Sequence, residues 1–77
     1  MNSWVIVIYE STEPDTLWTY VIDEDPMTWI PREKGQEWVL FSAVRIRDSA
    51  QRRWFEALDG SKTQRVRLEQ EYPPPGA

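Results

Sequence analysis

The chain has 77 residues, no cysteine and no histidine, which excludes disulfide bonds, thiolate nucleophiles and imidazole ligands. Zinc and haem sites depend on such ligands, so we expect no metal and no cofactor. The length allows one domain with a small core, and the formal net charge of −4 is unevenly divided, with −6 on residues 1–44 and +2 on residues 45–77.

Residues 4–9, WVIVIY, form an apolar run rich in β-branched side chains, which predicts a strand. Both faces of this strand are apolar, as is typical of a central strand that is covered on both sides. Residues 11–15, STEPD, supply turn residues, and residues 16–23 predict a second strand that ends before Pro26. The two segments together predict a β-hairpin.

The N-terminal apolar run has neither the basic residues nor the cleavage site of a signal peptide. No segment has the roughly 18 apolar residues that a membrane span needs. We therefore expect a cytoplasmic protein that makes no contact with membranes, and the lack of cysteine agrees with a reducing compartment.

Residues 24–36 contain two prolines and a glycine and show no clear hydrophobic period, which predicts a loop that presents Trp29 between Pro26 and Pro31. A short strand over residues 27–30 is the alternative. The acidic run at residues 23–25 has the oxygen ligands that Mg²⁺ uses. No phosphate-binding glycines accompany it, so we interpret the run as a solvated turn and not as a metal site.

Residues 37–58 allow two interpretations. In the first, residues 38–47 form a strand and Asp48 or Ser49 caps a short helix, which the β-branched residues favour. In the second, the whole segment is one helix, because at about 100° per residue most of its polar side chains fall within one arc and its apolar side chains fall opposite. Gly60 then follows as a terminating glycine. We favour the single helix, which places Arg47 on the apolar side and therefore requires an acidic partner for it.

Residues 62–72 alternate Val66 and Leu68 with charged side chains, which predicts a half-buried strand, and residues 73–77, PPPGA, predict a proline-rich tail. The expected fold is α+β, with a small antiparallel sheet of three to four strands in the order ββαβ and one long helix packed on one face. Residues 1–72 would form the single domain. One helix cannot cover both faces of this sheet, so we expect the second face to be covered by the loop, a second subunit or a foreign protein.

No nucleophile–base pair or catalytic motif is evident, so we expect no enzyme activity. The uncovered face instead predicts a small, acidic, tryptophan-rich protein-interaction module that forms a homodimer or binds a host protein. Inhibitors and adaptors of phages and mobile elements are proteins of this kind. The expected partner-binding residues combine outward aromatic side chains with an arginine, a composition that is common in binding hot spots: Trp29, Trp38, Phe41 and Arg45.

Single-stranded nucleic acid is the alternative partner. Arginines beside aromatic side chains can hold such strands, and the face in question would carry Arg52, Arg53, Arg65 and Arg67. The chain as a whole is acidic, with an isoelectric point near 4.7, which is the reverse of the usual charge of nucleic-acid-binding proteins. A protein partner is therefore the preferred interpretation.

Overall fold

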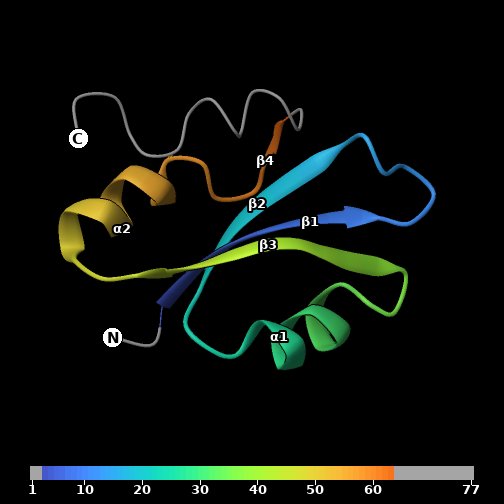
Figure 1. Ribbon diagram of the computed structural model, residues 1–77, viewed down its shortest axis with the longest axis horizontal. Helices are drawn as coiled ribbons and strands as arrows, with labels where there is room; N and C mark the ends of the chain where they lie inside the picture. Colours follow the sequence, from blue (N-terminus) through green and yellow to red (C-terminus); the bar gives the residue numbers. More distant parts are fainter. Residues whose placement is uncertain (1–2, 64–77) are drawn as a thin grey trace.

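Four strands form one antiparallel sheet in the order β3, β1, β2, β4 (Figure 1). The structure, a computed structural model, describes residues 3–63. Its strands are β1 (Ser3–Glu10), β2 (Leu17–Ile22), β3 (Trp38–Ile46) and β4 (Ser61–Thr63), and its helices are α1 (Pro26–Glu33) and α2 (Ser49–Glu56). The expected α+β class with a small antiparallel sheet is confirmed, and so is the hairpin of β1 and β2.

The sheet has a helix on each of its two faces. On one face, Ile6, Ile8 and Ile22 pack with Ile30 of α1. On the other face, Val5 and Ile46 of the sheet pack with Phe55 of α2. The expected ββαβ order with one long helix was wrong, because the described chain runs ββαβαβ with two short helices. The second face is covered by the segment at residues 24–36, one of the three covers expected, although this segment forms α1 and not a loop. Two short helices on opposite faces explain why the side chains of β1 are buried on both sides from residue 5 to residue 8.

Helix α1 occupies the segment that the sequence predicted to be a loop. Asp25 caps it, because the carboxylate accepts a hydrogen bond from the Met27 backbone N–H at 2.8 Å, and Pro26 takes the first turn, where no N–H donor is needed. The helix ends at Glu33, and Gly35 follows shortly after it with a φ of 106°, which favours glycine. The predicted loop and the alternative strand at residues 27–30 were both wrong. Pro26 and Gly35, which suggested a loop, mark the two ends of a helix, and this helix is too short to show a clear hydrophobic period.

Residues 38–58 form β3 and α2, so the single long helix favoured from the sequence was wrong and the strand-plus-helix interpretation is confirmed. Asp48 caps α2 by accepting a hydrogen bond from the Gln51 backbone N–H at 2.7 Å. Arg47 lies between the two elements and is exposed. The acidic partner expected for a buried Arg47 is therefore not required.

A β-bulge in β3 explains why this strand resembled a helix in sequence. Val7 pairs with Ser42 and Ile8 pairs with Leu40, so the register skips Phe41. The residues that pair with the α1-facing side chains of β1 are spaced by two, three and two positions: Trp38, Leu40, Ala43 and Arg45. The extra residue places Leu40 and Ala43 three positions apart and Trp38 and Arg45 seven apart, spacings that also recur on one face of a helix, whereas an uninterrupted strand keeps a strict period of two.

Two further expectations concern parts of the chain beyond this description. The strand predicted over residues 62–72 begins within β4, and its remainder lies outside the described residues, as does the proline-rich tail at residues 73–77. Across residues 3–63, neither helix has the length and apolar character needed to cross a membrane.

Candidate functional site

The outer edge of β3 is the most extensive stretch of open strand backbone in residues 3–63. β3 is nine residues long and lies at the end of the strand order, so within the described chain it pairs with β1 alone. Along an edge strand, N–H and C=O groups at alternate residues point away from the sheet and can pair with an added strand. We call this row of backbone groups the β3 edge.

Within residues 3–63, the opposite side of the sheet has no open edge of comparable length. β4 pairs with residues Leu17–Thr19 of β2, the Gly60 N–H donates to the Thr19 carbonyl oxygen at 2.6 Å, and the Asp59 carboxylate accepts from the Val21 N–H at 2.7 Å. The outer side of β2 is thus occupied along most of its length. β4 is described over Ser61–Thr63, where the described part of the chain ends.

Two adjoining hollows lie between α1 and the α1-facing side of β3. The larger, of about 440 Å³, is lined by Trp4, Glu24, Asp25, Pro26, Met27, Leu40, Ala43 and Arg45. The smaller, of about 240 Å³, is lined by Met27, Ile30, Pro31, Gly35, Gln36, Trp38 and Leu40. Met27 and Leu40 border both hollows, so the two form one groove along β3, here called the α1–β3 groove.

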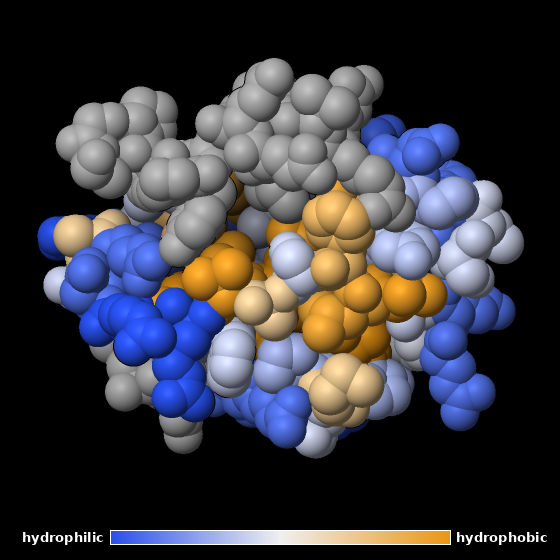
Figure 2. All heavy atoms as spheres, viewed as in Figure 1, coloured by the Kyte–Doolittle hydropathy of each residue, from blue (hydrophilic) through white to orange (hydrophobic). Residues whose placement is uncertain are grey.

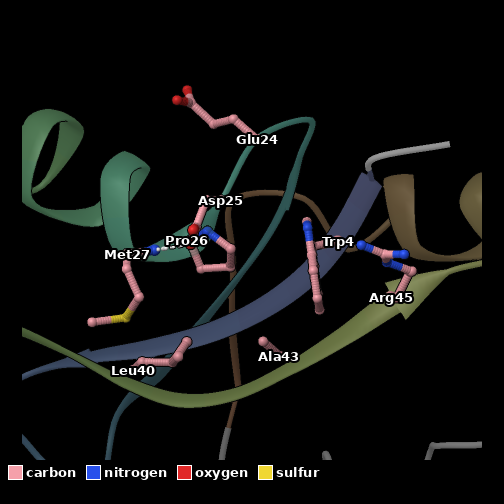
Figure 3. A pocket seen from close by; sticks show the side chains of 8 residues that line it. All are labelled: Trp4, Glu24, Asp25, Pro26, Met27, Leu40, Ala43 and Arg45. Atoms are coloured by element: carbon pink, nitrogen blue, oxygen red, sulfur yellow. Dashed lines mark hydrogen bonds between the residues drawn. The ribbon is translucent and has the colours of Figure 1, made fainter.

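The larger hollow has an apolar floor and mixed walls. Figure 3 shows Leu40 and Ala43 on β3, with Met27 and Pro26 of the α1 N-terminus on one side and the ring of Trp4 on the other. The Trp4 ring stands between the start of α1 and Arg45 (Figure 3). Met27 is 69% exposed, so it is available for contact with a ligand. An extended segment could place apolar side chains here.

Each end of the groove carries a cation above an aromatic ring. The Arg45 guanidinium carbon lies 5.0 Å from the centre of the Trp4 ring, and Lys34 Nζ lies 4.5 Å from the centre of the Trp38 ring. Lys34 Nζ also donates a hydrogen bond to the Tyr20 hydroxyl at 2.9 Å. These contacts hold both cations beside the groove and combine charge with flat apolar surface.

The acidic run at residues 23–25 serves the fold in three different ways. Asp23 accepts hydrogen bonds from Arg52 and Ser3, and Glu24 forms an ion pair with Arg32. The hydrogen bonds from Arg52 and Ser3 lower the pKa of Asp23, and the hydrogen bond from Arg32 lowers that of Glu24. Asp25 caps α1. Throughout the described residues, no three acidic side chains are grouped so that they could hold a metal ion.

The four predicted partner-binding residues occupy different places. Trp38 and Arg45 line the two ends of the α1–β3 groove, and Phe41 lies at the bulge between them. Trp29 borders neither hollow; it is half-buried, and its ring centre lies 5.3 Å from that of Tyr20. The groove residues that sequence reasoning missed are Trp4, Met27 and Leu40, and the overlooked signal was the Asp25–Pro26 helix start that brings α1 over β3.

Two of the four arginines of the expected nucleic-acid face, Arg52 and Arg53, lie within residues 3–63. Arg52 donates hydrogen bonds to Asp23, Glu56 and Ser3, so its guanidinium is already engaged. Arg53 is exposed on α2. Arg65 and Arg67 lie outside the described residues.

Comparisons of this chain with models of known protein families, with curated proteins and with solved structures gave no match. The functional inference therefore rests on the geometry of the β3 edge and the α1–β3 groove.

Proposed function

We propose that this chain is a non-catalytic protein-interaction module that binds an extended segment of its partner along the β3 edge. The observation that carries the proposal is a nine-residue edge strand beside an apolar groove that opens on the same strand. In strand addition, backbone hydrogen bonds provide affinity and pockets for alternate side chains provide specificity. The β3 edge supports the first of these contributions, and the groove supports the second.

The dimensions of the groove favour an extended segment over a folded domain. Successive side chains of a strand point to opposite faces, so every second side chain of an added strand would face the groove. Leu40 and Met27 would contact apolar side chains in the middle, and Trp38 and Arg45 would contact those at the ends. Aromatic residues and arginine are over-represented among the side chains that dominate binding energy.

Two kinds of partner suit this edge, a foreign protein and a second copy of the chain, because both can supply an extended strand. Binding of a host protein by an inhibitor or adaptor of a phage or mobile element needs no catalytic group, and this remains our proposal for the biological setting. A cytoplasmic location is part of the same proposal, since a chain of 77 residues without cysteine suits a reducing compartment.

The test is to select binding peptides on the purified wild-type protein. Their binding is then compared with that to a variant in which the groove is blocked. Ala43 lies on the floor of the larger hollow, so Ala43→Phe should fill the hollow. Ala50→Phe adds the same ring at an exposed position of α2 and is the matched control. We expect peptides of about 12 residues selected on the wild type to bind the control equally and the groove variant at least tenfold more weakly.

Hydrogen exchange would locate the contact. A bound peptide should slow exchange of β3 amides while leaving those of β4 and α2 unchanged. Selected peptides that bind the groove variant as tightly as the wild type, or that protect α2 and not β3, would contradict the proposal.

A further inference from the structure

We propose that the strand that pairs with the β3 edge is β3 of a second copy, in antiparallel orientation, so that two four-stranded sheets join into one. This inference rests on the proposed function, since it names the partner that uses the same edge. Two copies related by a twofold axis present the same surface to each other, and an antiparallel strand pair satisfies that symmetry.

The composition of β3 lacks most features that normally keep edge strands apart. Its nine residues, WVLFSAVRI, contain no proline, no lysine and no acidic side chain, and Arg45 is its single charge. Edge strands that stay monomeric usually carry charged residues or proline, or are very short. The bulge at Phe41 and the charge of Arg45 are the protective features that β3 does have.

Charge at the two ends of β3 favours an antiparallel copy of itself. The first residue of β3 is flanked by Glu37 in sequence and by Glu10 across the sheet, since Glu10 pairs with Trp38. Among the described residues, these two carboxylates outnumber the single cation at this end, Lys34, which lies over the Trp38 ring. The last residues of the strand are flanked by Arg45 and Arg47. Antiparallel pairing brings the acidic end of one copy beside the basic end of the other, twice in each dimer, whereas parallel pairing would bring like charges together.

These charges are available for such pairing. Glu37, Arg45 and Arg47 are exposed, and no ion pair among residues 3–63 engages any of the three. Figure 2 shows apolar side chains gathered across the middle of one face of the molecule, with hydrophilic side chains toward both ends. The net charge of −4 opposes association of two copies, but salt at physiological ionic strength screens this repulsion beyond roughly 8 Å.

Two charge-reversed variants test the proposal. Each variant alone should weaken the dimer, and a mixture of the two should restore it. Glu37→Arg makes both ends of β3 basic, and Arg47→Glu makes the C-terminal end more acidic. Each variant alone should dimerise at least tenfold more weakly than the wild type, because like charges meet at both ends. An equimolar mixture of the two should restore association as a heterodimer, because in the mixed pair a basic side chain again faces an acidic one at each end.

Sedimentation equilibrium provides the measurement, with a monomer mass of 9.2 kDa. We expect the wild type at about 100 μM to sediment with twice that mass. Arg53→Glu, a reversal at an exposed position of α2, is the matched control and should dimerise like the wild type. Circular dichroism of each variant establishes that it is folded.

A wild type that remains monomeric at about 100 μM would overturn the inference. Dimers that withstand both reversals, or a mixture that fails to associate, would also overturn it, because the contact would then lie elsewhere. Selected peptides that bind the β3 edge of a monomeric wild type would leave the proposed function standing while this inference fails.

Discussion

Trp29 and Trp4 lie on the same side of the sheet but have different surroundings. Trp29 belongs to α1 and packs against Tyr20, whereas Trp4 borders the larger hollow with Arg45 beside its ring. Both are half-buried, so the degree of burial alone does not distinguish packing from binding. Both rings pack against the same core cluster, but their other neighbours differ: Trp29 contacts Tyr20, whereas Trp4 also borders the larger hollow.

Replacement of Trp29 by alanine should therefore reduce stability. We expect Trp29→Ala to lower the free energy of unfolding by about 2 kcal/mol or more, because a large partly buried ring leaves the contact between α1 and the sheet. Met27→Ala, on the same helix but largely exposed, should change it by less than about 1 kcal/mol. Urea denaturation measures both. Equal losses in the two variants would show that the Trp29 contact with Tyr20 adds little.

At the scale of single elements, both helices are too short to be stable alone. α1 and α2 have eight residues each, well below the roughly 12–15 residues that an isolated helix needs. Each has an aspartate as N-cap, Asp25 for α1 and Asp48 for α2, and each buries one large apolar side chain against the sheet, Ile30 and Phe55. Capping and packing thus stabilise two helices that the hydrophobic period of the sequence alone does not predict.

The caps can be tested as a pair. Asp25→Ala and Asp48→Ala should each lower the free energy of unfolding by about 1 kcal/mol, since each leaves a first-turn N–H without its side-chain acceptor. Asp25→Asn and Asp48→Asn, which keep an accepting oxygen, should retain most of the stability. Thermal unfolding followed by circular dichroism compares the four variants. An alanine variant as stable as its asparagine counterpart would exclude capping at that position.

Prediction from the sequence succeeded where the local pattern was uniform and failed where one residue changed it. The β1–β2 hairpin could be predicted because both strands keep regular composition up to a turn. β3 was mistaken for helix because the extra residue Phe41 shifts the alternation, and α1 was missed because eight residues carry too little periodicity. Trp38 and Arg45 could be selected by composition, whereas Trp4 and Met27 become groove residues only once α1 lies over β3.

At the scale of the whole molecule, one polar cluster joins three elements. The Arg52 guanidinium on α2 donates to Asp23 at the end of β2 and to Ser3 at the start of β1, at 2.7 and 2.6 Å, and Ser3 is buried. Arg52 also pairs with Glu56 one turn later. The cluster therefore fixes α2 to the sheet at the end where β1 begins.

This cluster should make stability sensitive to acid. Hydrogen bonds from Arg52 and Ser3 lower the pKa of Asp23 below its usual 3.8, so the folded state binds this proton less readily than the unfolded state. The contribution of Asp23 is thus present above about pH 5 and is lost as the pH falls through the lowered pKa. The effect should be modest, since the Asp23 side chain is 68% exposed.

Thermal midpoints between pH 7 and pH 2 provide the measurement. Asp23→Asn should melt below the wild type at pH 7, and the difference should shrink below about pH 4. Asp15→Asn, in the exposed β1–β2 turn, is the matched control for removal of a carboxylate and should melt like the wild type at pH 7. A difference between Asp23→Asn and the wild type that stays constant down to pH 2 would contradict this role of the carboxylate.

The bulge in β3 also determines how the strand can change in length. Removal of Phe41 would join Leu40 directly to Ser42 and restore a strict alternation, so the side chains on either side would keep the faces that they occupy now. Removal of Val44 would instead turn the residues on one side of the gap to the opposite face, which would take Ile46 out of the core beside α2 and turn Arg45 toward that core. Within β3, a one-residue deletion should therefore be tolerated at Phe41 and not at Val44.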